Sequence, residues 1–138
     1  MELEYSIEWF QFADSDLAAA EYLQGMHPQP MEIICYHCQQ SAEKYLKGYL
    51  IFKDTVAPPR IHNIDTLCEM CSEHDGRFHE IKKACNVLTG YGVQSRYPNE
   101  MEITENDMQN ALAYARQIQE FEPLRELRRS EKTSQLTG

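Results

Sequence analysis

The sequence has little glycine, no long apolar run and none of the motifs that mark the familiar enzyme classes. It holds 6 glycines in 138 residues, with no glycine-rich phosphate loop, Gly-x-Ser-x-Gly elbow or His-Glu-x-x-His pair. No apolar run approaches the roughly 20 residues of a membrane-spanning helix, and the N-terminus lacks the basic start and apolar stretch of a secretory signal. These absences exclude the common catalytic motifs and predict a cytoplasmic protein.

Disulfides and basic side chains are also scarce. The five cysteines are an odd number in a chain without an export signal, which predicts reduced thiols rather than a disulfide scaffold. Lys and Arg number 13 against 22 Asp and Glu, for a net charge of −9. Because nucleic-acid affinity depends largely on neutralising phosphates, binding to long DNA is not expected, although a local basic pocket remains compatible with this charge.

Helical periodicity runs through the chain, and no segment shows the alternation typical of a strand. The segments that carry it are 5–24, 31–53, 64–73, 78–89 and 104–118. Thr104 and Asp107 have the spacing of a capping box, and Pro123 is expected to end the last helix. We therefore expect an all-α fold, an up-and-down four- to five-helix bundle. It forms a single domain over residues 1–123, followed by a polar, flexible tail at 124–138.

The second of these segments carries a polar stripe opposite its apolar face. On a helical wheel of about 100° per residue, its apolar and polar positions separate cleanly. The members of this polar stripe are His37, Gln40, Glu43, Lys44 and Lys47. One interpretation is a solvated face. The other is a local cationic site, because an imidazole, an amide and two ammonium groups within about two turns suit phosphates or base edges.

Two Cys-x-x-Cys pairs, Cys35 with Cys38 and Cys68 with Cys71, have the spacing of zinc ligands. The 29 residues between the pairs exceed the usual zinc-ribbon gap, and both pairs fall in predicted helices near an apolar face. We interpret them as small buried hydrophobic residues and expect no metal and no cofactor. A zinc site remains open if the two helices pack side by side. A redox role is disfavoured, because the strand that normally precedes such a motif is missing.

Four blocks of the sequence resemble HEPN domains, the "higher eukaryotes and prokaryotes nucleotide-binding" family. The run from Cys35 to Leu50 is similar to the signature helix of that family. The other blocks are Trp9, Ala13, Asp16-Leu17 and Ala20 in the first helix, His62-Asn63-Ile64 with Leu67, and Ser95-Arg96-Tyr97-Pro98. The blocks follow the family order and extend over Trp9 to Phe121, which is nearly the whole chain.

The resemblance implies a helical bundle, homodimerisation and binding of a nucleotide or RNA. Some members pair with a minimal nucleotidyltransferase in toxin-antitoxin systems, and others are ribonucleases. The ribonuclease members carry an Arg followed, after four to six residues, by a His. Here Arg60 lies too close to His62, Arg77 lies too close to His79, and no His follows Arg96. The pair that would supply the acid, the base and the phosphate-binding cation is therefore missing, and the catalytic residues are unknown.

The resemblance adds His62, Arg96 and Tyr97 to the candidate ligand site. Arg96 would grip a phosphate with two hydrogen bonds, and Tyr97 would stack on a base. In the alternative, His62 packs at a helix start and Arg96 anchors its loop to the acidic body. Three functions remain open: a nucleotide- or RNA-binding module that serves a nucleotidyltransferase, a metal-independent ribonuclease toxin that uses His37 or His62 with Arg96, and a purely structural dimerisation module.

Overall fold

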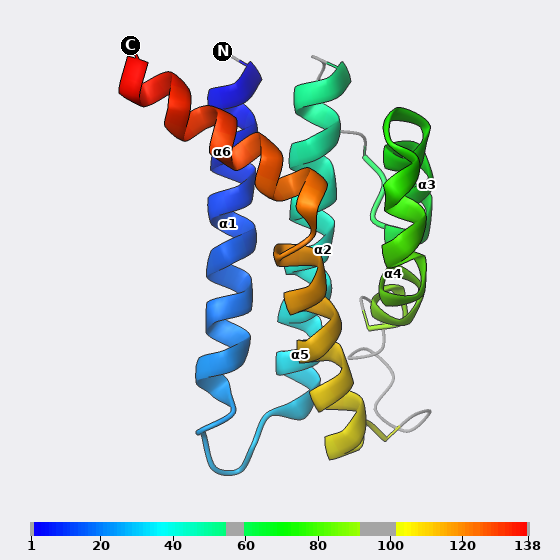
Figure 1. Cartoon of the computed structure of the whole chain (residues 1–138). Helices are drawn as coiled ribbons and strands as arrows, with labels where there is room; N and C mark the ends of the chain where they lie inside the picture. Colours follow the sequence, from blue (N-terminus) through cyan, green and yellow to red (C-terminus); the bar gives the residue numbers. More distant parts are fainter. Residues whose placement is uncertain (1, 55–59, 92–101, 138) are drawn as a thin grey trace.

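Two long antiparallel helices form the centre of the fold. In the computed structural model, α1 (Glu2–Leu23) and α2 (Met31–Asp54) lie side by side along their whole length (Figure 1). The described residues are 2–54, 60–91 and 102–137, with side chains described from 4 to 130 within these ranges. This part of the chain contains helices and no strand, so the predicted all-α bundle is confirmed.

Shorter helices surround this hairpin. They are α3 (Ile64–His74), the 3₁₀ helix η1 (Gly76–Ile81), α4 (Lys82–Thr89), α5 (Glu105–Gln119) and α6 (Glu122–Thr137). The α3–α4 pair flanks one side of α2, α5 packs along its front, and α6 crosses the end of α1 (Figure 1). The predicted capping box is confirmed, since Thr104 and Asp107 hydrogen-bond each other's backbone N–H groups. None of the helices described combines the length and apolar character that crossing a bilayer requires.

α2 is buried over most of its length, because α1, α3, α4 and α5 pack around it and α1 approaches it closely. The hydroxyl of Ser41 donates to the carbonyl oxygen of Ala13 across the two helices at 2.8 Å. A Cβ added at Gly48 would lie 2.7 Å from the Phe10 ring and 3.2 Å from the Trp9 Cβ. Only a residue without a side chain allows this approach. The central helix therefore has little of the solvent-exposed surface that its polar residues suggest.

Residues 124–138 were expected to form a flexible tail, but the structure continues as α6 through Thr137. Leu124 is fully buried and Leu127 is 8% exposed, so the first half of this helix belongs to the core. Pro123 lies in the first helical turn, where a missing N–H removes no hydrogen bond. Pro123 thus lies at the start of a further helix instead of ending the fold, and the three-residue spacing of Leu124 and Leu127 was the signal for that helix.

Candidate functional site

The exposed end of the polar stripe is organised by a carboxylate from α1. Asp16 accepts a hydrogen bond from Lys44 Nζ at 2.5 Å through Oδ2 and lies 3.1 Å from His37 Nδ1 through Oδ1. The His37 and Lys44 side chains are 29% and 27% exposed, and the Asp16 side chain is 14% exposed. We call these three residues the outer cluster. It joins α1 to two successive turns of α2 and leaves its basic groups within reach of solvent.

A second carboxylate organises the rest of the stripe from within α2. Glu43 Oε2 lies 3.1 Å from Lys47 Nζ and 3.2 Å from His62 Nδ1, and Oε1 accepts from the Gln39 amide at 3.3 Å. We call these four residues the inner cluster. The Glu43 and Lys47 side chains are only 7% and 6% exposed, whereas His62 is 79% exposed. The inner cluster therefore fixes the segment before α3 onto the buried part of α2.

The polar stripe is therefore neither a solvated face nor a set of unpaired cations. α1 flanks it through Asp16, and the segment that carries His62 contacts its other side. Each lysine is matched by one carboxylate, so the two clusters are close to electrically neutral when the histidines are neutral. A phosphate that binds here must share the lysines with carboxylates that already accept from them. Gln40 extends the inner cluster, because its amide donates to the Gln39 side-chain oxygen at 2.8 Å.

Both histidines of the site form a pair with a carboxylate through the same ring nitrogen. In Asp16–His37 and in Glu43–His62, the carboxylate lies against Nδ1. A carboxylate accepts a hydrogen bond there, which places the proton of a neutral ring on Nδ1 and leaves the lone pair on Nε2. Each ring thus has one nitrogen that can accept a proton or a hydrogen bond from a ligand.

The structure brings His62 to the polar stripe, as the candidate ligand site requires. The other two candidates that came from the resemblance, Arg96 and Tyr97, lie outside the described residues. Two residues of the site carried no signal in the helical pattern, namely Gln39 and the carboxylate of Asp16. Asp16 was identified only as part of a family-like block. Its role depends on the pairing of two helices, which periodicity within one helix does not reveal.

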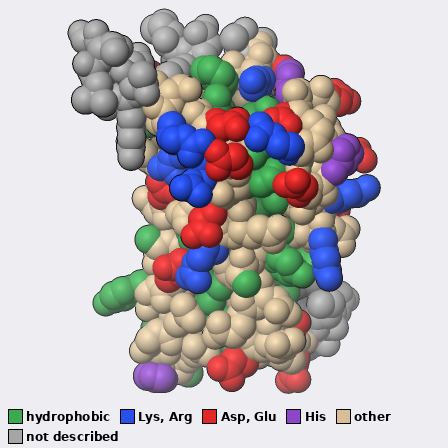
Figure 2. Space-filling model, viewed as in Figure 1, with side chains coloured by type: hydrophobic (Ala, Val, Ile, Leu, Met, Phe, Trp, Pro, Cys, Tyr) green, Lys and Arg blue, Asp and Glu red, His purple; other side chains and the backbone are tan. Residues whose placement is uncertain are grey.

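A third polar cluster, which the sequence did not predict, lies on the other side of α1. Asp14 accepts from Arg128 Nη2 at 2.5 Å, from the Gln119 amide at 3.1 Å and from the Tyr45 hydroxyl. We call it the C-terminal brace, since Arg128 comes from α6. Burial alone would raise the pKa of Asp14, but the hydrogen bonds from Arg128, Tyr45 and Gln119 hold it below its ordinary value of 3.8. Figure 2 shows basic and acidic side chains alternating over this region, where α6 crosses α1.

The cysteines of both Cys-x-x-Cys pairs are buried. Burial raises the pKa of Cys35 and Cys38 to about 12, and Cys71 donates a weak hydrogen bond to the Leu46 carbonyl oxygen at 3.7 Å. Cys68 is 4% exposed. In the described ranges, no group of three or more His, Cys, Asp or Glu is placed to hold a metal ion. The four thiols pack as small apolar side chains, and nothing in this geometry favours the zinc interpretation.

Comparison with known proteins identifies the family. The family model described as HEPN domain matches residues 7–127. Among solved structures, the crystal structure of TT1696 from Thermus thermophilus is similar, with a TM-score of 0.74 and 24% sequence identity. The similarity covers 88% of this chain and 97% of that chain, and it shows a shared fold. A search of the curated proteins finds no match. The family match extends over most of the chain, from α1 into α6, and the chain therefore belongs to the HEPN domain family.

Proposed function

We propose that this HEPN domain binds a nucleotide or an RNA end at the outer cluster. The observation that carries the proposal is the fixed, half-exposed position of Lys44 and His37 against Asp16. An ammonium group has three N–H donors, and Asp16 occupies one of them, so a phosphate can bind without breaking the pair. Because Asp16 already holds the Lys44 side chain in place, binding a phosphate costs less side-chain entropy.

The surroundings of the outer cluster offer contacts for a base as well as a phosphate. Tyr36 is 38% exposed, and its ring centroid lies 6.0 Å from that of His37 in an edge-on arrangement. An exposed tyrosine ring is a surface on which a base stacks, and the amide of Gln40 is suited to base edges. The buried Glu43–Lys47 pair supports this face from below and is not itself a contact in the proposal.

Calorimetry with AMP, ATP and a short oligoribonucleotide tests the proposal. Lys44→Met and His37→Gln should each weaken binding by about 10-fold or more, because each removes a charged or polar phosphate contact. Lys83→Met is the matched control, since Lys83 is an exposed lysine on α4, outside the site. If none of these ligands binds the wild-type protein, or if Lys44→Met binds them as well as the control does, the proposal is wrong.

The two carboxylate–histidine pairs favour metal-independent RNA cleavage as a second candidate function. Cleavage at a 2′-hydroxyl needs a base and an acid, and His37 and His62 each have an Nε2 suited to proton transfer. Arg96 is the proposed cation for the phosphate. The test is incubation of purified protein with RNA in excess EDTA. Cleavage by the wild type that is lost in both His37→Gln and His62→Gln supports the candidate, and intact RNA eliminates it.

The apolar residues on the surface of the α1–α2 hairpin support a partner role. Phe12 is 62% exposed, Ile33 is 52% exposed and Tyr5 is 45% exposed. We propose a second copy of this chain as the first partner, with a minimal nucleotidyltransferase, which the resemblance implies, as a further one. Sedimentation should show a dimer that Phe12→Glu converts to monomer. A dimer that fails to bind the nucleotides named above would favour a purely structural interaction module.

A further inference from the structure

The hydrogen bonds between α3 and α4 set these helices in an antiparallel register. The Asp65 backbone N–H donates to Thr89 Oγ1 at 3.2 Å, and the Asn86 amide donates to Asp65 Oδ2 at 3.1 Å. The first turn of α3 therefore lies beside the last turn of α4. One turn further along each helix, this register places Cys68 opposite Cys85.

Both thiols are shielded from water, since Cys85 is fully buried and Cys68 is 4% exposed, and each shifts the pKa of the other across the helix pair. Cys68 Sγ donates to the Phe78 carbonyl oxygen at 3.5 Å. The neighbouring Cys85 thiol lowers the pKa of Cys68, and the Cys68 thiol together with burial raises the pKa of Cys85. Of the two sulfurs, Cys68 is the one nearer the surface, and we assign it as the one that reacts first.

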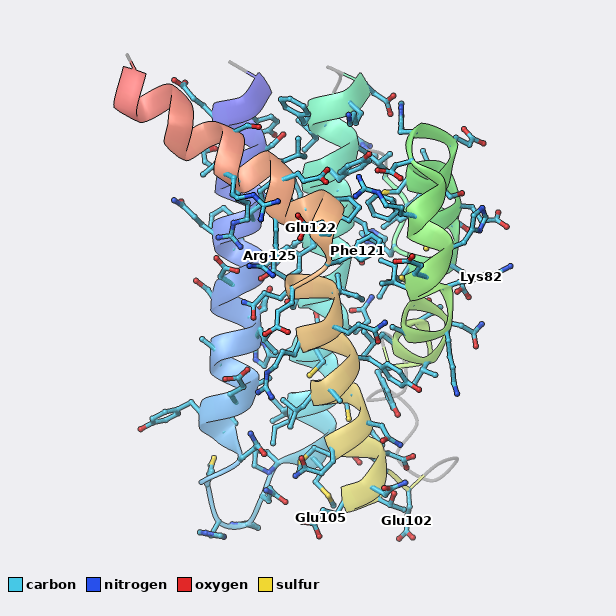
Figure 3. The ribbon with its side chains drawn as sticks, viewed as in Figure 1. Lys82, Glu102, Glu105, Phe121, Glu122 and Arg125 are labelled. Atoms are coloured by element: carbon cyan, nitrogen blue, oxygen red, sulfur yellow. The ribbon has the colours of Figure 1, made fainter. Side chains whose placement is uncertain are left out.

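A cavity connects Cys68 to solvent. It has a volume of about 190 Å³, and Cys68, His79, Lys82 and Asn86 lie in its wall. Since a water molecule occupies about 30 Å³, a solute of the size of hydrogen peroxide fits. Figure 3 shows Lys82 on the outer side of α4, away from the α1–α2 hairpin. The carboxylates of Asp65 and Glu69 raise the pKa of Cys68, and the ammonium group of Lys82 lowers it. Cys85, fully buried, has no such access.

We propose that Cys68 and Cys85 form an oxidisable dithiol that hydrogen peroxide converts into a disulfide between α3 and α4. This modification site is separate from the α1–α2 polar clusters. It pairs one cysteine of a Cys-x-x-Cys motif with a distant fifth cysteine, and it does not use Cys71. Oxidation would lock the α3–α4 unit, whose two helices are otherwise held by side-chain packing and a few hydrogen bonds.

The chemistry balances in two displacement steps. The Cys68 thiolate attacks one peroxide oxygen, the O–O bond breaks, and the departing hydroxide takes up a proton as water, leaving a sulfenic acid on Cys68. The Cys85 sulfur then attacks the Cys68 sulfur and the S–O bond breaks. The second hydroxide leaves with the Cys85 proton as water. Two thiols and one peroxide give one disulfide and two waters, with two electrons passing from sulfur to peroxide.

Peptide mapping of the full chain tests the proposal. The folded protein is treated with hydrogen peroxide, denatured, alkylated without reductant and digested with trypsin. The expected product links the peptide 61–77, which holds Cys68 and Cys71, to the peptide 84–96, which holds Cys85. Titration under denaturing conditions should show the loss of two of the five free thiols. A map in which both peptides remain fully alkylated overturns the proposal.

Three variants identify the sulfurs involved. Cys71→Ser should still form the linked peptide, whereas Cys68→Ser should not. Cys85→Ala should accumulate the sulfenic acid on Cys68, which dimedone labels, with labelling several-fold above that of wild type. A link that persists in Cys68→Ser, or that disappears in a folded Cys71→Ser, contradicts the assignment. Because the wild-type map already decides whether the disulfide forms, a variant that fails to fold leaves the proposal testable.

Discussion

The two lysine–carboxylate pairs on α2 have the same chemistry and opposite surroundings. Lys47 and Glu43 are 6% and 7% exposed, and both come from the same helix. Lys44 is 27% exposed, and its partner Asp16 comes from α1. The two lysines are only three positions apart in the sequence. The comparison shows that position around the central helix, and not residue type, decides whether a pair stabilises the fold or remains able to meet a ligand.

Burial changes what each pair contributes. Ions removed from water must be matched closely, and removing one partner of a buried pair leaves an uncompensated charge that costs several kcal/mol. A half-exposed pair contributes little to folding, because water and salt screen it. Lys47 is therefore a structural residue and Lys44 a candidate ligand contact, although the helical wheel places both lysines in the same polar stripe.

The largest expected effect comes from breaking the inner pair. Lys47→Met should lower the free energy of unfolding by about 3–5 kcal/mol, because Glu43 would remain buried without its cation. The double variant Lys47→Met with Glu43→Gln removes both charges and keeps an amide for Gln39 and His62. It should recover most of the loss in urea denaturation. A single variant that unfolds at the wild-type urea midpoint would show that this pair is not energetically buried.

The next effect comes from the close approach that buries this part of α2. Gly48→Ala should cost about 1–3 kcal/mol, because the new methyl group would lie within 3 Å of the Phe10 ring and force the helices apart. Gly76→Ala is the matched control, since a Cβ there meets nothing within 4 Å and should change stability by less than about 0.5 kcal/mol. Equal urea midpoints for the two variants would contradict the packing described here.

A smaller effect tests the C-terminal brace as a third kind of pair. The pKa of Asp14 is depressed in the folded chain, so its contribution is present above the unfolded pKa and is lost as pH falls through the folded pKa. Stability should therefore drop once pH falls below about 4. Asp14→Asn should remove about 1 kcal/mol at neutral pH and make the acid side of the curve flatter. Urea midpoints measured from pH 3 to pH 7 give both curves, and parallel curves would be the contrary result.

The smallest effect on stability belongs to the outer pair. Lys44→Met should change the free energy of unfolding by less than about 1 kcal/mol, because water already solvates part of this pair. Comparison with Lys47→Met then shows how much more the buried lysine contributes to stability than the partly exposed lysine on the same helix. Thermal unfolding of both variants, with Lys83→Met as the exposed control, measures that contrast. A loss from Lys44→Met as large as that from Lys47→Met would erase it.

Much of the fold follows from local patterns in the chain. The apolar spacing gave most helices near their observed bounds, and Thr104 with Asp107 gave the start of α5. The predicted helix at 78–89 begins instead as the 3₁₀ helix η1, and its α-helical part starts at Lys82. The prediction of a flexible tail failed, because α6 begins at Glu122 and continues through Thr137. Short, mostly polar segments have weak periodicity, and α6 is held by two buried leucines and by Arg128 on Asp14. The Arg128–Asp14 contact joins residues more than a hundred positions apart, so the local pattern does not reveal it.

In the candidate site too, some features follow from the sequence and others only from the tertiary structure. The sequence by itself determined which polar groups α2 carries, because a helix fixes the side of each residue by its number alone. The i,i+4 spacing of Glu43 and Lys47 also allowed that pair to form within one helix. Only the tertiary structure decided that Asp16 holds Lys44 and His37, that Glu43 also holds His62, and that the Glu43–Lys47 pair is buried. The reason is physical: the energy of a charge depends on the water and the counter-charges around it. Those come from neighbouring helices and segments, which no single helix specifies.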